Sequence, residues 1–415
     1  MLIVLSSGAF IQQIKDGGAR EQGLENSLVY TGPLNKLPLI WLVGILFFIA
    51  ILILTKNLKR IKIAWPMVVL IAFCFTSTIW ADFPKVAFQS TLFIAAAYLL
   101  ISAQTALYGG QATIQFVSRV FFMILASSLI AVLIVPSYGL AVGDEHAGRW
   151  QGVFDHKNGL GNFSAMAFLF YVWRYQQQKS KSALVAALLS VVLVIASQSS
   201  TALVNMVIVI LISTLLSFKF TTKIIYRLRY VLIGFLIASS FFAVLVAIGF
   251  QEFSIFEKDS SFSNRNLIWI YILSKVSASP WIGYGMDQLG VLTNKNSAEF
   301  FTNVGFLVGS SHNGFLETAF SLGYIGLILM LWVLMSQLSN KRGGIGFPLL
   351  FGYIILFIVV NTFEARMISF NIYFIGLMYV MAIADAMAMP TVEANYTRIR
   401  STYQFLDPIR KADRI

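Results

Sequence analysis

Long apolar stretches alternate with short polar gaps along nearly the whole chain of 415 residues. Most stretches hold about 17–25 residues, the length of an α-helix that crosses the hydrocarbon core of a bilayer. The opening residues 1–14 predict a thin first span, which brings the total to about 12 transmembrane helices. The other predicted spans are 38–54, 63–80, 86–107, 112–135, 159–175, 182–198, 201–218, 230–250, 313–336, 345–362 and 368–387.

The composition supports an all-α integral membrane protein. Hydrophobic residues make up 58% of the chain and charged residues only 12%, whereas soluble domains carry about 25% charged residues. The single cysteine, Cys74, lies in an apolar stretch, which rules out an intrachain disulfide and predicts a buried structural thiol.

The charged residues divide between the two sides of the predicted membrane. One set of short loops, with the C-terminal tail, holds 19 basic and four acidic residues, and the other side holds 11 basic and 14 acidic ones. Cytoplasmic loops are enriched in Lys and Arg, so the basic set predicts the cytoplasmic side and places both termini inside. The net charge of +12 then reflects topology, and nucleic-acid binding is not needed to explain it.

Two external segments, 136–158 and 251–312, are much longer than the rest and contain all three histidines, His146, His156 and His312. Ionisable groups are nearly absent from the middle of the spans, with Glu317 as the main exception. Ion-coupled transporters usually need charged groups at midplane depth. The pattern therefore predicts a site at the outer boundary between membrane and water.

The same pattern divides the chain into four parts: an N-terminal transmembrane bundle (1–250, with the loop 136–158), a large external loop (251–312), C-terminal transmembrane helices (313–390) and a cytoplasmic tail (391–415). The basic tail predicts contact with anionic headgroups. Residues 264–280 of the large loop predict a helix lying in the interface, with Trp269 and Tyr271 as its anchors.

Three basic residues of the external segments are candidates for binding phosphate. Arg149 and Arg265 carry guanidinium groups, which bind phosphate oxygens in a two-pronged geometry. Either arginine can equally be a boundary residue that contacts lipid headgroups. Lys157 is either a phosphate contact or a solvated loop charge.

The remaining candidates lie at expected helix starts. His312 belongs to SSHNGFLE, typical of the cap and first turn of a helix, where the helix dipole lowers the pKa of a histidine and favours its neutral form. His156 is either a site residue or the cap of a helix that starts near Gly159. Asn158 and Asn313 have the same alternative, because asparagine is a preferred N-cap.

Cofactor signatures are missing from the sequence. No Asp-x-Asp pair occurs, the three histidines lie far apart, and no Gly-x-x-x-x-Gly-Lys-Ser/Thr loop is present. We therefore expect chemistry without a metal or nucleotide cofactor.

Four stretches resemble motifs of the O-antigen ligase/polymerase superfamily, especially its ExoQ-like exopolysaccharide branch. RWQGVFDHKNGLG (149–161) resembles its R-x-x-G-x-x-x-H-K-N-x-x-G motif. NRNLIWIYILSKVSASPWIGYG (264–285) is similar to the Arg, Trp and P-x-x-G-x-G segment, although Asn264 stands where many members have Gly. SHNGFLETAFSLGYIGL (311–327) matches the His-Asn motif, and NTFEARMISFN (361–371) resembles a weaker motif around Glu364.

The resemblance implies a GT-C-like glycosyltransferase of the bacterial inner membrane, with its large loop and active site on the periplasmic face. Such enzymes pass a glycan from undecaprenyl diphosphate to an acceptor hydroxyl. In a polymerase the acceptor is another lipid-linked repeat unit, and in a ligase it is lipid A-core. The His-Lys-Asn pattern favours the polymerase. Expected partners are these two substrates, membrane lipids and a chain-length regulator.

Roles follow for the candidate residues. His312 would take the proton of the acceptor hydroxyl, while Arg149 and Arg265 stabilise the departing diphosphate. The substrate-binding candidates are His156, Lys157, Asn158, Asn313 and Glu364. A lipid-linked glycan flippase or exporter is the competing hypothesis, followed by a structural partner in an envelope assembly.

Overall fold

A computed structural model describes residues 61, 63–141, 147–249, 260–295, 310–339 and 345–387. These residues form helices and no β-strand, apart from one isolated bridge between Leu140 and Trp150. The helices are α3 (Trp65–Thr76), α4 (Pro84–Ile134), α5 (Pro136–Gly139), α6 (Lys157–Gln178), α7 (Lys181–Ser197), α8 (Ser200–Leu215), α9 (Lys219–Gly249), α10 (Ser260–Ala278), α11 (Leu289–Lys295), α13 (Gly314–Ser339), α14 (Phe347–Phe363) and α15 (Ile372–Met387), with a 3-10 turn at Ser77–Ile79.

The all-helical prediction is confirmed for this part of the chain. Three helical segments are long and apolar enough to cross a membrane: Pro84–Ile134, Lys219–Leu245 and Gly314–Ser339. Five shorter apolar helices, of 10–17 residues, accompany them. The total of about 12 spans stays a prediction. The expected spans 1–14 and 38–54, His146 and the tail 391–415 lie outside the described residues.

Helix α4 contains two of the expected spans, 86–107 and 112–135. Its 51 residues are interrupted at Gly109, whose φ of 77° favours glycine. The hydroxyl oxygens of Thr105 and Thr113 lie 3.4 Å apart, although eight residues of straight helix would separate them by about 12 Å. The helix therefore folds back on itself at Gly109 and forms two arms.

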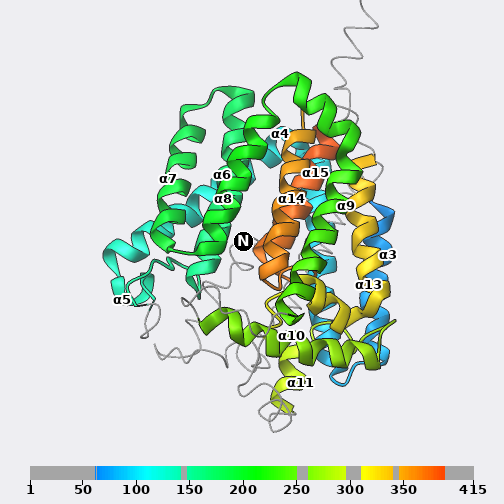
Figure 1. Cartoon of the computed structure of the whole chain (residues 1–415). Helices are drawn as coiled ribbons and strands as arrows, with labels where there is room; N and C mark the ends of the chain where they lie inside the picture. The colour runs from blue at the N-terminus through cyan, green and yellow to red at the C-terminus, as the bar shows by residue number, and fades with distance from the viewer. Residues whose placement is uncertain are drawn as a thin grey trace, which may run out of the picture.

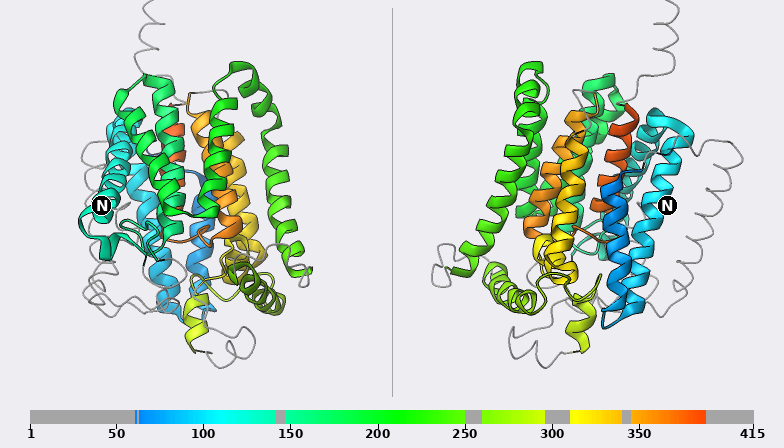
Figure 2. Two further views of the ribbon diagram at one scale, coloured as in Figure 1. Left: turned by 60° about the vertical axis from the view of Figure 1, so that its left-hand side comes forward. Right: turned by 90° about the vertical axis from the view of Figure 1, so that its right-hand side faces the viewer.

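The helices α6, α7, α8, α9, α13, α14 and α15 run side by side, and α10 lies across their lower end (Figures 1 and 2). At this end α6, α8, α13 and α15 begin, whereas α7, α9 and α14 end (Figure 1). The described parts of both long external segments lie here, and the short basic connections lie at the opposite end. We call the lower end the site end.

The core of the bundle is apolar and centres on α14 and α15. Almost every residue of α14 is buried, so this helix is enclosed on all sides. Phe121 of α4 packs edge-on against Phe163 and Phe170 of α6, with ring centroids 5.3 and 5.4 Å away. Helices α7, α8 and α9 instead carry many exposed large apolar side chains, as expected of surfaces that face lipid.

The expected helix in the large loop is present as α10, but Trp269 and Tyr271 are not the anchors that the sequence suggested. Their exposed fractions are 1% and 7%. The indole nitrogen of Trp269 donates to the carbonyl of Ser311 at 2.9 Å, and this contact holds the ring inside the protein. The prediction that these rings anchor the helix in the membrane interface was wrong, because α10 packs this apolar segment, LIWIYIL, against the bundle and buries both rings.

Helix α13 is broken at Gly323, where φ is 63°. The PWIGYG segment (280–285) packs on the break: the amides of Tyr284 and Gly285 donate to Phe320 and Ser321, at 2.9 and 2.8 Å. A Cβ atom at Gly323 would lie 2.2 Å from the carbonyl carbon of Trp281. This close approach fixes the end of the large loop against α13.

Candidate active site

Polar side chains from several helix ends meet at the site end of the bundle. Asn158 lies in the first turn of α6, and Glu364 is the residue directly after α14. The side-chain amide of Asn158 donates to the carboxylate of Glu364 at 3.0 Å. The hydroxyl of Ser199, which caps α8, donates to the amide oxygen of Asn158 at 2.7 Å. The two hydrogen bonds join α6, α8 and the end of α14, which lie far apart in the sequence.

The start of α13 and the start of α10 approach the same place. Asn313 donates from its side-chain amide to the carbonyl of Thr362 at 3.0 Å. Arg265 donates to the carbonyl of the next residue, Phe363, at 3.3 Å. The structure thus brings four of the candidate residues, Asn158, Glu364, Asn313 and Arg265, around the end of α14.

His312 lies directly before this cap, with its ring half-buried and its backbone in the left-handed region at φ 51°. Its Nδ1 atom is buried and has no hydrogen-bond partner among the described residues. Burial lowers the pKa of His312 below its ordinary value of 6.5; Arg265 and Arg366 lower it further, and Glu364 opposes them. The predicted direction is confirmed, with burial as the main cause.

Glu364 is the acidic partner of this histidine and is only 8% exposed. Burial by itself raises the pKa of the carboxyl group, but the nearby charges of His312, Arg366 and Arg265 outweigh burial and leave the pKa below its ordinary value. A carboxylate in these surroundings remains ionised at neutral pH.

Arg366 is a member of the cluster that the sequence analysis missed. Burial lowers the pKa of its guanidinium, yet Asp155 and Glu364 outweigh burial and raise it above its usual range. The backbone amide of Arg366 donates to Asn361 at 2.9 Å, which fixes the turn after α14. The signal was the Glu-x-Arg of NTFEARM, a stretch in which only Glu364 was selected.

The helix N-caps show which of His156, Asn158 and Asn313 has the capping role that the sequence left open. His156 is the N-cap of α6, which starts at Lys157, two residues before the expected Gly159, and its Nδ1 accepts the amide of Asn158 at 3.1 Å. Asn313 caps α13 by accepting the amides of Phe315 and Leu316, each at 3.0 Å. Asn158 is not a cap, since it lies inside the first turn and binds Glu364.

Arg149 and Lys157 belong to the segment that leads into α6. The carbonyl of Arg149 accepts the amide of Ala141 at 2.8 Å, and the next residue, Trp150, bonds to Ala196 near the end of α7. Arg265 and Arg366 shift the pKa values of His312 and Glu364. Lys157 is buried, at 9% exposure, beside the cap of α6.

Positive potential at the cluster has two sources. The starts of α6, α13 and α15 point their positive dipole ends toward it, but side-chain caps already accept several first-turn amides. The arginines are therefore the main groups left to bind an anion. Within the described ranges, no group of three or more His, Cys, Asp and Glu side chains is arranged to hold a metal ion.

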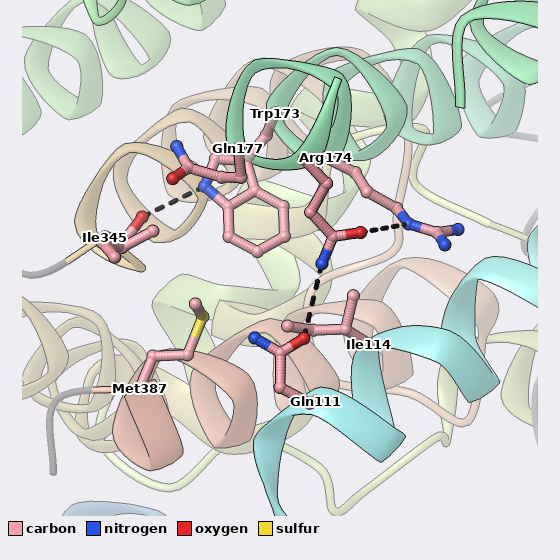
Figure 3. A pocket seen from close by; sticks show the side chains of 8 residues that line it. Gln111, Ile114, Trp173, Arg174, Gln177, Ile345 and Met387 are labelled. Carbon is pink, nitrogen blue, oxygen red and sulfur yellow. Dashed lines mark hydrogen bonds between the residues drawn. The ribbon is translucent and has the colours of Figure 1, made fainter. Parts of the chain in front are cut away.

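A small cavity of about 130 Å³ lies at the opposite end of α6, roughly 30 Å from His156 at 1.5 Å per residue. Gln178 accepts a hydrogen bond from Arg174 and donates one to Gln111, each at 3.4 Å; Figure 3 shows Arg174 and Gln111 at this cavity. The indole of Trp173 donates to the carbonyl of Ile345 at 3.1 Å. The cavity is separate from the His312 cluster, and these bonds tie α6 to α4 and to the start of α14.

Two comparisons identify relatives of this chain. The model of the family described as O-antigen ligase matches residues 184–331, from α7 into α13. This segment includes Arg265 and His312 and leaves out Arg149 and Glu364. The ComP-specific O-oligosaccharyltransferase of Acinetobacter baylyi (strain ATCC 33305 / BD413 / ADP1) is 30% identical over 191 residues, which are 42% of this chain and 33% of the relative.

The chain thus matches about one third of the length of that curated relative. The segment that the family model matches contains α10, with Arg265, and the His-Asn motif at the start of α13. The motifs, the helical bundle and both matches agree in showing that the chain is similar to proteins of the O-antigen ligase/polymerase superfamily.

Proposed function

We propose that the protein is a membrane glycosyltransferase that moves a glycan from undecaprenyl diphosphate to an acceptor hydroxyl. The observation that carries this proposal is the cluster itself: a histidine with a lowered pKa lies among Glu364, Arg265 and Arg366 at one end of a membrane bundle. A base next to fixed cations suits a reaction in which a hydroxyl loses a proton and a diphosphate leaves.

His312 is the base in this mechanism. Its neutral form takes the proton of the acceptor hydroxyl as the oxygen attacks the anomeric carbon, and the bond from that carbon to the diphosphate oxygen breaks. Among the described residues, the buried Nδ1 atom has no hydrogen-bond partner, and we propose that it accepts the hydroxyl proton once the acceptor is bound. Glu364 stabilises the imidazolium that forms, because its charge raises the pKa of His312.

The arginines stabilise the leaving group. Arg265 and Arg366 place two permanent positive charges near His312, and such pre-positioned charges lower the free energy of a transition state in which negative charge develops. Arg149 and Lys157, from the segment before α6, are proposed as further phosphate contacts. His156, Asn158 and Asn313 complete the substrate site by holding the backbone and side chains around it.

Another lipid-linked repeat unit is our first candidate for the acceptor, which makes the protein a polysaccharide polymerase. A second candidate is transfer of the finished glycan to a different acceptor, such as lipid A-core or a protein. The names of the matched family and relative, an O-antigen ligase and an O-oligosaccharyltransferase, favour this second reaction. Both reactions use the same donor and the same base.

The test uses the purified protein in nanodiscs with undecaprenyl-diphosphate-linked repeat units and EDTA. A ladder of products without further acceptor is expected for a polymerase. A single product that needs added lipid A-core or acceptor protein would replace polymerisation by transfer. The variants His312→Ala and Arg149→Ala are each expected to abolish transfer at normal membrane levels. Wild-type activity of His312→Ala would refute the proposed base.

The proposed location is the inner membrane, with the cluster on the periplasmic face and both termini in the cytoplasm. The separation of the long external segments from the short basic connections supports this orientation.

A further inference from the structure

The backbone before the proposed base is held by an unusual set of contacts. Ser311 precedes His312, and its amide donates to the carboxylate of Glu317 at 2.8 Å. Its carbonyl accepts the indole N–H of Trp269 at 2.9 Å. Its hydroxyl donates to the carbonyl of Asn313 at 2.7 Å. Both backbone groups and the side chain of Ser311 are therefore engaged.

This residue is fixed next to a strained conformation. His312 has a φ of 51°, in the left-handed region that few residues other than glycine adopt. Such a conformation persists only where the surrounding contacts enforce it. Besides the contacts of Ser311, the amide of His312 itself donates to the hydroxyl of Ser310 at 3.2 Å.

Glu317 takes no step in the proposed mechanism, and its charge is the last of the causes that act on the pKa of Arg366. It is the one notable ionisable residue in the interior of the predicted spans, it lies in the first turn of α13, and its side chain reaches back toward the residue before the cap. The acidic residue that acts on the pKa of His312 is Glu364. A role for Glu317 through backbone geometry fits these facts better than a role through charge.

Trp269 connects the same point to the large loop. Its ring is 1% exposed, and it belongs to α10, the helix that also carries Arg265 one turn earlier. The hydrogen bond to Ser311 thus sets the distance between the helix that bears the arginine and the residue that precedes the histidine.

We propose that Glu317 and Trp269 are positioning residues that hold Ser311 from its two backbone groups and keep His312 in its left-handed, reaction-ready orientation. This inference rests on the proposed function, since it names what positions the proposed base. Neither residue needs to touch substrate. The hydrogen bond from Ser311 requires an acceptor oxygen at position 317, and a negative charge is not essential.

The experiment compares Glu317→Leu, which removes the acceptor at similar size, with Glu317→Gln, which keeps an acceptor oxygen without the charge. Amide hydrogen exchange is followed in the peptide 310–316, and kcat and KM for the lipid-linked donor are measured in nanodiscs. Glu317→Leu is expected to exchange about tenfold faster at this turn, because a local contact is lost. Its kcat should fall roughly 10- to 100-fold with little change in KM, the usual effect of misplacing a reactive group.

Glu317→Gln should stay near the wild type in exchange, kcat and pH profile. If it is impaired as strongly as Glu317→Leu, the charge matters and the proposal fails. Unchanged exchange in Glu317→Leu would also overturn it. The exchange measurement does not depend on activity, so a failure of the proposed function, seen as an active His312→Ala, is distinguishable from a failure of this inference.

A second pair of variants keeps the test independent of Glu317. Trp269→Phe removes the indole N–H and keeps an aromatic ring, and it should raise exchange at 310–316 and lower kcat in the same direction as Glu317→Leu. Its matched control is Trp281→Phe, because Trp281 is 64% exposed. Equal behaviour of the two tryptophan variants would contradict the role of Trp269.

Discussion

At the scale of single residues, the pH dependence of transfer should reveal the charges around His312. Burial and the arginines lower the pKa of the imidazole, so the neutral base persists below pH 6.5. The acid limb of kcat/KM reports the pKa of the base in the free enzyme. We therefore expect this limb to lie on the acidic side of 6.5 in the wild type.

Two substitutions should move the acid limb in opposite directions. Arg265→Gln removes a positive charge that lowers the pKa of His312, so the limb should move to higher pH. Glu364→Gln removes a negative charge that raises this pKa, so the limb should move to lower pH. The pH profile of kcat/KM can be measured for each variant even if only residual activity remains. Shifts in the same direction would show that another group is the base.

At the scale of helices, the two breaks at glycine allow backbone strain to be separated from steric overlap. Gly323→Ala combines a positive φ with a Cβ 2.2 Å from the backbone of Trp281, and Gly109→Ala has the positive φ but open space. We expect Gly109→Ala to cost about 1–2 kcal/mol of stability, and Gly323→Ala to cost clearly more. The control Gly234→Ala, in open space on α9, should be neutral or slightly stabilising.

Thermal unfolding in detergent, monitored by tryptophan fluorescence, ranks the three variants by stability. Equal stability of Gly323→Ala and Gly109→Ala would mean that the PWIGYG segment is not held against α13 as the structure describes. Since this segment follows α10, a weakened Gly323→Ala protein should also lose transfer activity through displacement of Arg265.

The sequence predicts helices better than it predicts what their polar residues contact. Apolar length located α7, α8, α13 and α14 closely, because the cost of exposing backbone in lipid enforces helix formation. The same pattern could not show that Trp269 faces inward, since an aromatic residue suits both an interface and a core. It also missed Arg366, because the approach of the turn after α14 to the start of α6 is a long-range contact that leaves no local periodicity.

At the scale of the whole molecule, the two ends of the bundle differ in kind. The site end collects helix starts, His312, Glu364 and the arginines, whereas the other end has short connections rich in basic residues. This asymmetry suits an enzyme that takes a lipid-linked substrate on one face of a membrane. It also makes the orientation of the protein the most direct test of where the reaction occurs.

The single cysteine makes this orientation measurable. Cys74 is buried, with an exposed fraction of 1%, so it should react little with a membrane-impermeant maleimide in intact cells. Ser277→Cys places an exposed thiol on α10 at the site end, and Gln177→Cys places one on α6 at the opposite end. With the site end in the periplasm, Ser277→Cys should be labelled in intact inner-membrane spheroplasts and Gln177→Cys only after the membrane is opened. The reverse pattern would place the cluster in the cytoplasm and would remove the periplasmic donor from the proposed reaction.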